Sequence, residues 1–118
     1  MSQHPFDKFN LELRQFAIDR DWEQFQSPKN VAMALIVEAA ELVEHFQWLS
    51  EDESYQLPAE KRKAVAHEMA DVLIYLMRLS DRLDIDLMQA VEEKIQLNAE
   101  KYPVEKVKGS AKKYSEYD

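Results

Sequence analysis

Two short pairs of acidic residues are the part of this sequence best suited to chemistry. Glu38 and Glu41 are three residues apart, and so are Glu68 and Asp71. Each pair lies in a segment with helical periodicity, so both acids of a pair project from one side of a helix and can share a ligand. Carboxylate oxygens are the ligands that hard divalent ions prefer. The spacing therefore predicts a magnesium site, with manganese as the alternative ion.

Both pairs border the apolar side of their helices. At ~100° per residue, Glu41 lies at about 300° when Glu38 is set to zero. Asp71 has the same position relative to Glu68. In an antiparallel hairpin both pairs would lie ~13 to 15 Å from the turn, so the four acids would meet at one level. Their repulsion would destabilise the fold unless a cation neutralised it. One pair alone indicates only a solvated face, but two matched pairs favour a metal site.

A di-iron carboxylate bundle is the competing interpretation of acids on paired helices. Such a site needs a Glu-x-x-His motif. Neither His45 nor His67 has a glutamate three residues before it. The sequence therefore favours the magnesium site over a di-iron site.

The elements that carry these acids are predicted to be helices. The 118 residues include only one Gly and four Pro, and the segments between them are rich in helix formers. Ser27 followed by Pro28 marks a helix start, and Asp86 with Gln89 resembles a capping box. The sequence thus predicts an all-α bundle of about four helices whose central antiparallel pair carries ExxE and ExxD. The predicted helices cover residues 6–20, 28–49, 58–83 and 87–102.

These helices are expected to form one domain over residues 1–103, followed by a polar tail over residues 104–118. Pro103 sets the boundary, because the residue before a proline is disfavoured in a helix. The tail is either a solvated, disordered terminus or a flexible lid that adds positive charge over an anionic ligand. Its lysines are Lys106, Lys108, Lys112 and Lys113.

Composition and charge exclude several functions. A formal net charge of -8 disfavours binding to nucleic acid or to an anionic membrane, because the surface repels phosphate. The chain has no Cys, which excludes disulfides, thiolate metal sites and cysteine nucleophiles. It shows neither an export signal at its N-terminus nor an apolar run long enough to cross a bilayer. We therefore expect a cytoplasmic protein with no nucleic-acid or membrane partner.

The chain also resembles a known family. It is similar to the MazG-like all-α nucleoside triphosphate pyrophosphohydrolases, and within them to the dCTP pyrophosphatase group. The resemblance covers nearly the whole chain, and the patterns ExxE, ExxD and K-x-x-x-N-x-x-K-Y occur in the family's order. It rests on three segments, EAAELVEHFQW, HEMADVLIYLMRLSDRLDIDL and EKIQLNAEKYP.

This resemblance implies hydrolysis of a nucleoside triphosphate, such as dCTP or a related or modified nucleotide, to the monophosphate and pyrophosphate. Magnesium ions can neutralise phosphate oxygens and activate a water, so no covalent nucleophile is needed. Glu38 and Glu41 are the candidates for orienting or deprotonating that water. The resemblance implies four magnesium ligands, which are Glu38, Glu41, Glu68 and Asp71.

One row of polar residues is a candidate for phosphate and sugar binding. Lys94, Asn98 and Lys101 follow i, i+4, i+7 spacing, so two cations and one amide line one face of a helix. By itself this row indicates a solvated flank. The resemblance makes Asn98 and Lys101 expected substrate contacts and Lys94 a weaker one.

Three aromatic residues are candidates for stacking on the nucleobase. By the helical wheel, Trp48 lies at about 280°, on the Glu41 side of its helix, and Tyr75 lies at about 340°, beside Glu68. Trp22 precedes the predicted second helix. Aromatic side chains more often serve in packing, but the resemblance favours a base pocket for all three.

Assembly into a homodimer or homotetramer is expected. Long amphipathic helices in so short a chain leave apolar surface exposed, and family members assemble. The alternative to an enzyme is a catalytically silent helical oligomer that binds nucleotides.

Overall fold

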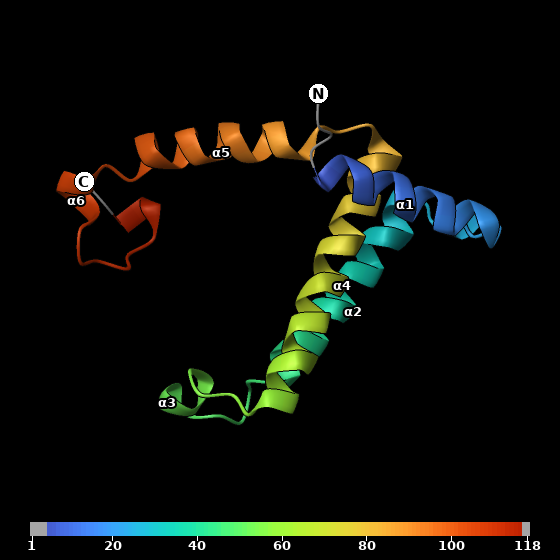
Figure 1. Ribbon diagram of the computed structural model, residues 1–118. Helices are drawn as coiled ribbons and strands as arrows, with labels where there is room; N and C mark the ends of the chain where they lie inside the picture. Colours follow the sequence, from blue (N-terminus) through green and yellow to red (C-terminus); the bar gives the residue numbers. More distant parts are fainter. Residues whose placement is uncertain (1–4, 117–118) are drawn as a thin grey trace. The chain divides into compact units, whose positions relative to one another are not determined.

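The computed structural model describes residues 5–116, and every regular element in that range is helical (Figure 1). The prediction of an all-α chain is therefore confirmed. None of the helices in this range is both long and apolar enough to cross a membrane. In chain order the elements are α1 (Pro5–Asp19), η1 (Glu23–Phe25), α2 (Pro28–Glu44), α3 (Glu51–Ser54), α4 (Ala59–Leu83), α5 (Leu87–Lys101), α6 (Val104–Val107) and η2 (Tyr114–Glu116).

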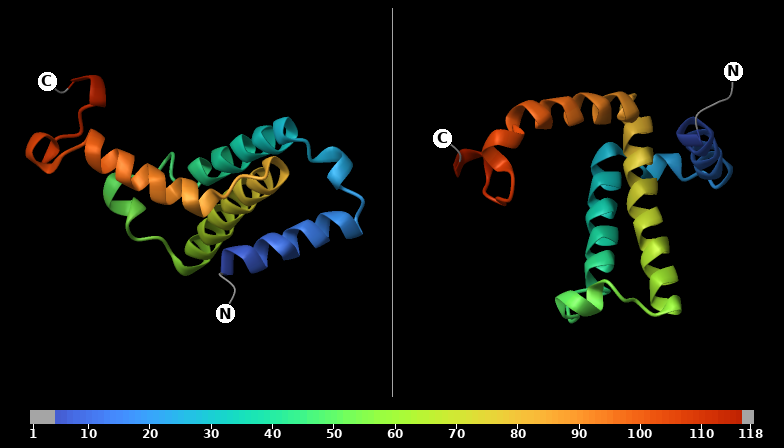
Figure 2. Two further views of the ribbon diagram at one scale, coloured as in Figure 1. Left: turned by 90° about the horizontal axis from the view of Figure 1, so that it is seen from above. Right: turned by 60° about the vertical axis from the view of Figure 1, so that its left-hand side comes forward.

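The chain divides into two compact units, Met1–Ile85 and Asp86–Asp118. In the first unit, α2 and α4 run antiparallel along each other, and the short α3 lies in the connection between them (Figures 1 and 2). Helix α1 packs against α4 as well. This antiparallel pair is the arrangement expected from the sequence.

Local signals explain where the two long helices begin and end. The Ser27 hydroxyl accepts a hydrogen bond from the Asn30 backbone N–H, and Pro28 occupies the first helical position. Helix α4 begins directly after Pro58. It ends at Asp84, whose φ of 54° is in the left-handed region that terminates a helix. The predicted caps at residues 27 and 86 are both present, since Asp86 accepts from the Gln89 N–H.

The connection between α2 and α4 differs from the prediction. Helix α2 ends at Glu44 and not near residue 49, because residues 45–49 form successive turns. A capping box then starts α3 within residues 50–57, the stretch left between the two predicted helices. Ser50 and Glu53 each accept a hydrogen bond from the backbone N–H of the other. At Asp86 only half of the predicted box forms, because the Gln89 amide donates to Glu93.

The second unit contains α5, α6 and η2. Within the tail, α6 and η2 form two short helical segments. The Tyr102 and Tyr114 rings meet edge to face at 6.0 Å, and the Lys101 ammonium lies 4.7 Å from the Tyr114 ring centre. The described part of the tail therefore folds against the end of α5.

The chain buries few apolar side chains. Among the described residues, the buried hydrophobic ones are Ala17, Val31, Val65 and Met77. Large side chains such as Ile36, which is 67% exposed, remain at the surface. Helices α1 and α4 also border an apolar groove of about 430 Å³. Its lining residues are Phe9, Glu12, Leu13, Phe16, Ala70, Leu73, Ile74 and Met77.

Candidate functional site

An acidic cluster lies between the two long helices of the first unit. Glu38 and Glu41 come from α2, and Glu68 comes from α4. One carboxylate oxygen from each of the three lies within 4.8 Å of the others. The cluster exists because α2 and α4 are antiparallel and bring their acids to the same level. Residues 27 to 30 residues apart in the sequence thereby share one small volume.

The polar atoms of this cluster are poorly satisfied by the protein itself. The Oε2 atoms of Glu38 and Glu68 are buried, and neither has a hydrogen-bond partner. A buried carboxylate oxygen without a partner is costly, and such groups are usually paired or bound to a metal. Three converging oxygen donors fit a hard divalent cation in number and chemistry. The residues present therefore suit a metal ion.

The electrostatics of the cluster point in the same direction. The pKa of Glu38 is raised from 4.5 to about 7, mainly by burial and then by the negative charges of Glu41 and Asp71. Asp71 is not one of the three converging acids, but its charge acts on Glu38. A cation at this position would reverse the effect and hold Glu38 ionised. The negative charges of the cluster therefore repel one another when no cation is bound.

Tyr75 lies beside the acids, one helical turn after Asp71 on α4. Burial is the main cause that raises the pKa of its phenol. The negative charges of Glu38, Asp71 and Glu41 raise this pKa as well. The phenol therefore stays protonated and can donate a hydrogen bond. The structure places Tyr75 where the helical wheel indicated.

The two tryptophans have different settings. Trp22 lies between α1 and η1, is 47% exposed, and meets the Phe16 ring edge to face with a centroid distance of 5.8 Å. Trp48 is 88% exposed and follows the end of α2. The prediction that Trp48 continues the face of α2 is wrong, because the helix stops at Glu44.

The row of residues on α5 belongs to the second unit. Lys94, Asn98 and Lys101 are all exposed on one helix. The Lys101 ammonium lies over the ring of Tyr114 and 5.7 Å from the centre of the Tyr102 ring. The row therefore offers cationic and amide groups to solvent.

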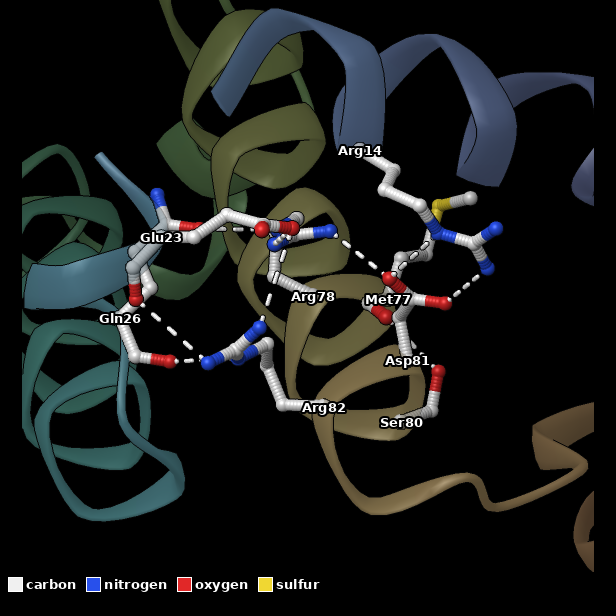
Figure 3. A network of polar contacts seen from close by, with 8 residues as sticks. All are labelled: Arg14, Glu23, Gln26, Met77, Arg78, Ser80, Asp81 and Arg82. Carbon is white, nitrogen blue, oxygen red and sulfur yellow. Dashed lines mark hydrogen bonds and ion pairs between the residues drawn. The ribbon is translucent and has the colours of Figure 1, made fainter. Parts of the chain in front are cut away.

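A polar network at the C-terminal end of α4 was not found from the sequence (Figure 3). Its centre is Arg78, a guanidinium that is only 3% exposed. Asp81 joins Arg78 to Arg14 of α1, and Gln26 joins it to the segment between α1 and α2. The only signal in the sequence was a charged residue inside the apolar run VLIYLMRLS. Gln26, its partner in the segment between α1 and α2, is 52 residues away and belongs to no motif.

Comparison with known proteins adds to this geometry. The MazG-like family matches the chain over residues 33–117. The dCTP pyrophosphatase 1 of Mus musculus is 46% identical over 104 residues, covering 86% of this chain and 61% of the mouse protein. The Homo sapiens protein of the same name is 41% identical with the same coverage. The chain thus spans about 61% of the length of these relatives.

A solved structure is similar in fold. The crystal structure of a pyrophosphatase from Archaeoglobus fulgidus superposes with a TM-score of 0.82 and is 38% identical. The match covers 87% of this chain and 96% of that one. The helical fold is therefore shared over nearly the full length of the archaeal protein.

Proposed function

Because this chain belongs to the MazG-like family, we propose that it is a nucleoside triphosphate pyrophosphohydrolase, which cleaves the bond between the α- and β-phosphates. The products are the nucleoside monophosphate and pyrophosphate. The observation that carries the proposal is the cluster of Glu38, Glu41 and Glu68, with two buried oxygens that lack a partner. The names of the mouse and human relatives favour dCTP, or a related or modified nucleotide, as the substrate.

The acids are proposed to hold Mg²⁺, with Mn²⁺ as the alternative. Glu38, Glu41 and Glu68 would supply the first ligands, and Asp71 adds negative charge beside them. A bound divalent ion neutralises phosphate oxygens and lowers the pKa of a coordinated water. Glu38 and Glu41 are proposed to orient that water and accept its proton, since their carboxylates lie at the proposed metal position.

The remaining parts of the nucleotide are assigned to the aromatic and cationic residues. Tyr75 is proposed to line the base pocket and to donate a hydrogen bond from its phenol to the substrate near the acids. Trp22 and Trp48 are proposed to stack on the base. In this acidic chain the exposed row on α5 favours binding of phosphate and sugar, and its members are Lys94, Asn98 and Lys101.

We also propose that the chain acts as a homodimer or homotetramer. Only four hydrophobic residues are buried among those described, and the α1–α4 groove is apolar. A second copy covering that groove would remove exposed apolar surface from water.

The test is turnover of a panel of ribo-, deoxyribo- and modified nucleoside triphosphates with and without Mg²⁺. Release of monophosphate and pyrophosphate should require the metal and fall by two orders of magnitude or more in Glu41→Gln. Glu44→Gln is the matched control, because Glu44 is exposed on the same helix. Binding of nucleotide without any turnover would instead favour the silent binding module.

A further inference from the structure

We propose that Arg78 is a positioning residue that holds Trp22 at the place where it stacks on the nucleobase. The proposal rests on the function proposed above and adds a residue that touches neither metal nor substrate. Trp22 is the residue between α1 and η1, and it is nearly half exposed. A stacking residue in a short connection needs its neighbours fixed on both sides, because free rotation of the connection would cost binding entropy.

The segment that follows Trp22 is tied to α4 by Arg78. The Nε of Arg78 donates to the side-chain oxygen of Gln26 at 3.0 Å. One terminal nitrogen of the same guanidinium lies 4.0 Å from a carboxylate oxygen of Glu23. A backbone hydrogen bond joins Trp22 to the same segment, since the Phe25 N–H donates to the Trp22 carbonyl at 2.9 Å. The η1 turn is therefore attached to α4 immediately after Trp22.

The helix that precedes Trp22 is tied to the same place. The other terminal nitrogen of Arg78 donates to Asp81 at 2.9 Å. Asp81 in turn accepts two hydrogen bonds from the guanidinium of Arg14 on α1, one of them 3.1 Å long from Nε. The Arg14 hydrogen bond is also the main cause that lowers the pKa of Asp81, which keeps it ionised. Both neighbours of Trp22 thus converge on Arg78 and Asp81 (Figure 3).

The position of Arg78 along α4 links this anchor to the acids. Arg78 follows Asp71 by seven residues, two helical turns, so the two side chains leave α4 on the same side about 10 Å apart along its axis. Tyr75 lies between them on that side. A nucleotide whose phosphates bind the acids would extend its sugar and base along α4 toward the anchored segment. Trp22, at the start of that segment, is then the proposed stacking partner of the base.

A purely stabilising role explains the network less well. A buried ion pair often adds little stability compared with apolar residues of similar volume, since removing charge from water is costly. Arg78 instead donates one hydrogen bond to Gln26, in the segment between α1 and α2, and one to Asp81 on its own helix, and these two directional bonds fix its geometry. The Phe16 ring, which meets Trp22 edge to face, lies on α1, the helix that Arg14 joins to Asp81.

The first experiment measures the order of Trp22 without any nucleotide. In a Trp48→Phe background, Trp22 is the single tryptophan of the chain. Arg78→Met should raise the acrylamide quenching constant of Trp22 about twofold. Gln26→Met, which removes one of the two contacts of Arg78 with this segment and leaves the Arg82 contacts in place, should raise it less. Arg62→Met is the matched control, because Arg62 is exposed on the same helix, and it should leave quenching unchanged. Unchanged quenching in both Arg78→Met and Gln26→Met would overturn the proposal.

The second experiment measures KM and kcat for dCTP. Loss of one base–aromatic stack should raise KM on the order of tenfold in Arg78→Met while kcat stays within about twofold. Trp22→Leu should have the same effect, and the double variant should be no worse than Trp22→Leu alone. Additive losses, or a loss in kcat alone, would show that Arg78 acts on the fold and not on Trp22.

The two experiments separate this proposal from the proposed function. If the parent protein does not hydrolyse dCTP, the enzymatic proposal fails, and the quenching result still decides whether Arg78 orders Trp22. If Arg78→Met does not fold, Gln26→Met carries both measurements, because Gln26 is partly exposed and its loss leaves the Arg78–Asp81 pair in place. No change in quenching or in KM for Gln26→Met would then refute the proposal.

Discussion

The charge strain of the acidic cluster makes a quantitative prediction about the metal-free protein. The pKa of Glu38 is raised from 4.5 to about 7, so the folded state retains a proton that the unfolded chain loses. The contribution of Glu38 is therefore neutral below pH 4.5, becomes unfavourable as the pH rises to 7, and is constant above that. The full shift corresponds to about 3 kcal/mol. Because Glu38 is partly exposed, we expect roughly 1 to 2 kcal/mol after solvent screening.

Glu38→Gln removes this cost, so the substitution should stabilise the protein without metal. In EDTA at pH 8 its melting temperature should exceed that of the parent by roughly 4 to 8 °C, and at pH 4.5 the two should nearly coincide. Saturating Mg²⁺ at pH 8 should reverse the order. At a hundredfold excess over Kd the metal stabilises the parent by about 2.7 kcal/mol, and Glu38→Gln has lost a ligand.

The measurement is differential scanning calorimetry at a fixed protein concentration, across pH 4.5 to 8, with and without Mg²⁺. Subtracting the melting temperature of the parent from that of the variant at each pH removes the contribution of all other titrating groups. Glu44→Gln, on the exposed side of α2, should show a flat difference across this range. A metal-free Glu38→Gln protein that is less stable than the parent at pH 8 would refute the reasoning.

Three further predictions concern other parts of the chain. Asp71→Asn should lower the pKa of Glu38, because it removes a nearby negative charge, and NMR titration of the metal-free protein should detect this. Ser50→Ala should cost about 1 kcal/mol in denaturant unfolding, because it removes the cap of α3; an unchanged midpoint would contradict that role. Leu73→Glu places a charge in the apolar groove and should lower the assembly state measured by analytical ultracentrifugation, whereas a monomeric parent would exclude the proposed assembly.

Much of the helical framework could be predicted because its signals are local. Ser27 with Pro28 and Asp86 before Leu87 are caps that act within a few residues, and the structure has both. The meeting of Glu38 with Glu68 followed from counting residues on either side of one turn. Three of the four acids converge although α2 ends early, because the turns over residues 45–49 and helix α3 lie outside the paired segment.

The errors and omissions also have physical causes. The capping box of Ser50 and Glu53 is a local signal, but three consecutive acids made the segment look like a loop. The Arg78 network could not be found because hydrogen bonds between distant residues have no periodicity. Arg14 and Asp81 are 67 residues apart, and only the packing of α1 on α4 brings them together.

One face of helix α4 carries acids of the proposed metal site together with the proposed positioning residue Arg78, and the other face lines the apolar groove. At 100° per residue, Asp71, Tyr75 and Arg78 lie within about 60° of one another, whereas Leu73 and Met77 lie on the other side and line the apolar groove. The acids on the polar face repel one another, so they cannot hold the helix in place by themselves. The register of α4 must instead come from α2 beside it, from the groove and from the Arg78 network. A shift of one residue would turn the acids by 100° away from α2, so the residues that fix this register also fix the proposed metal site.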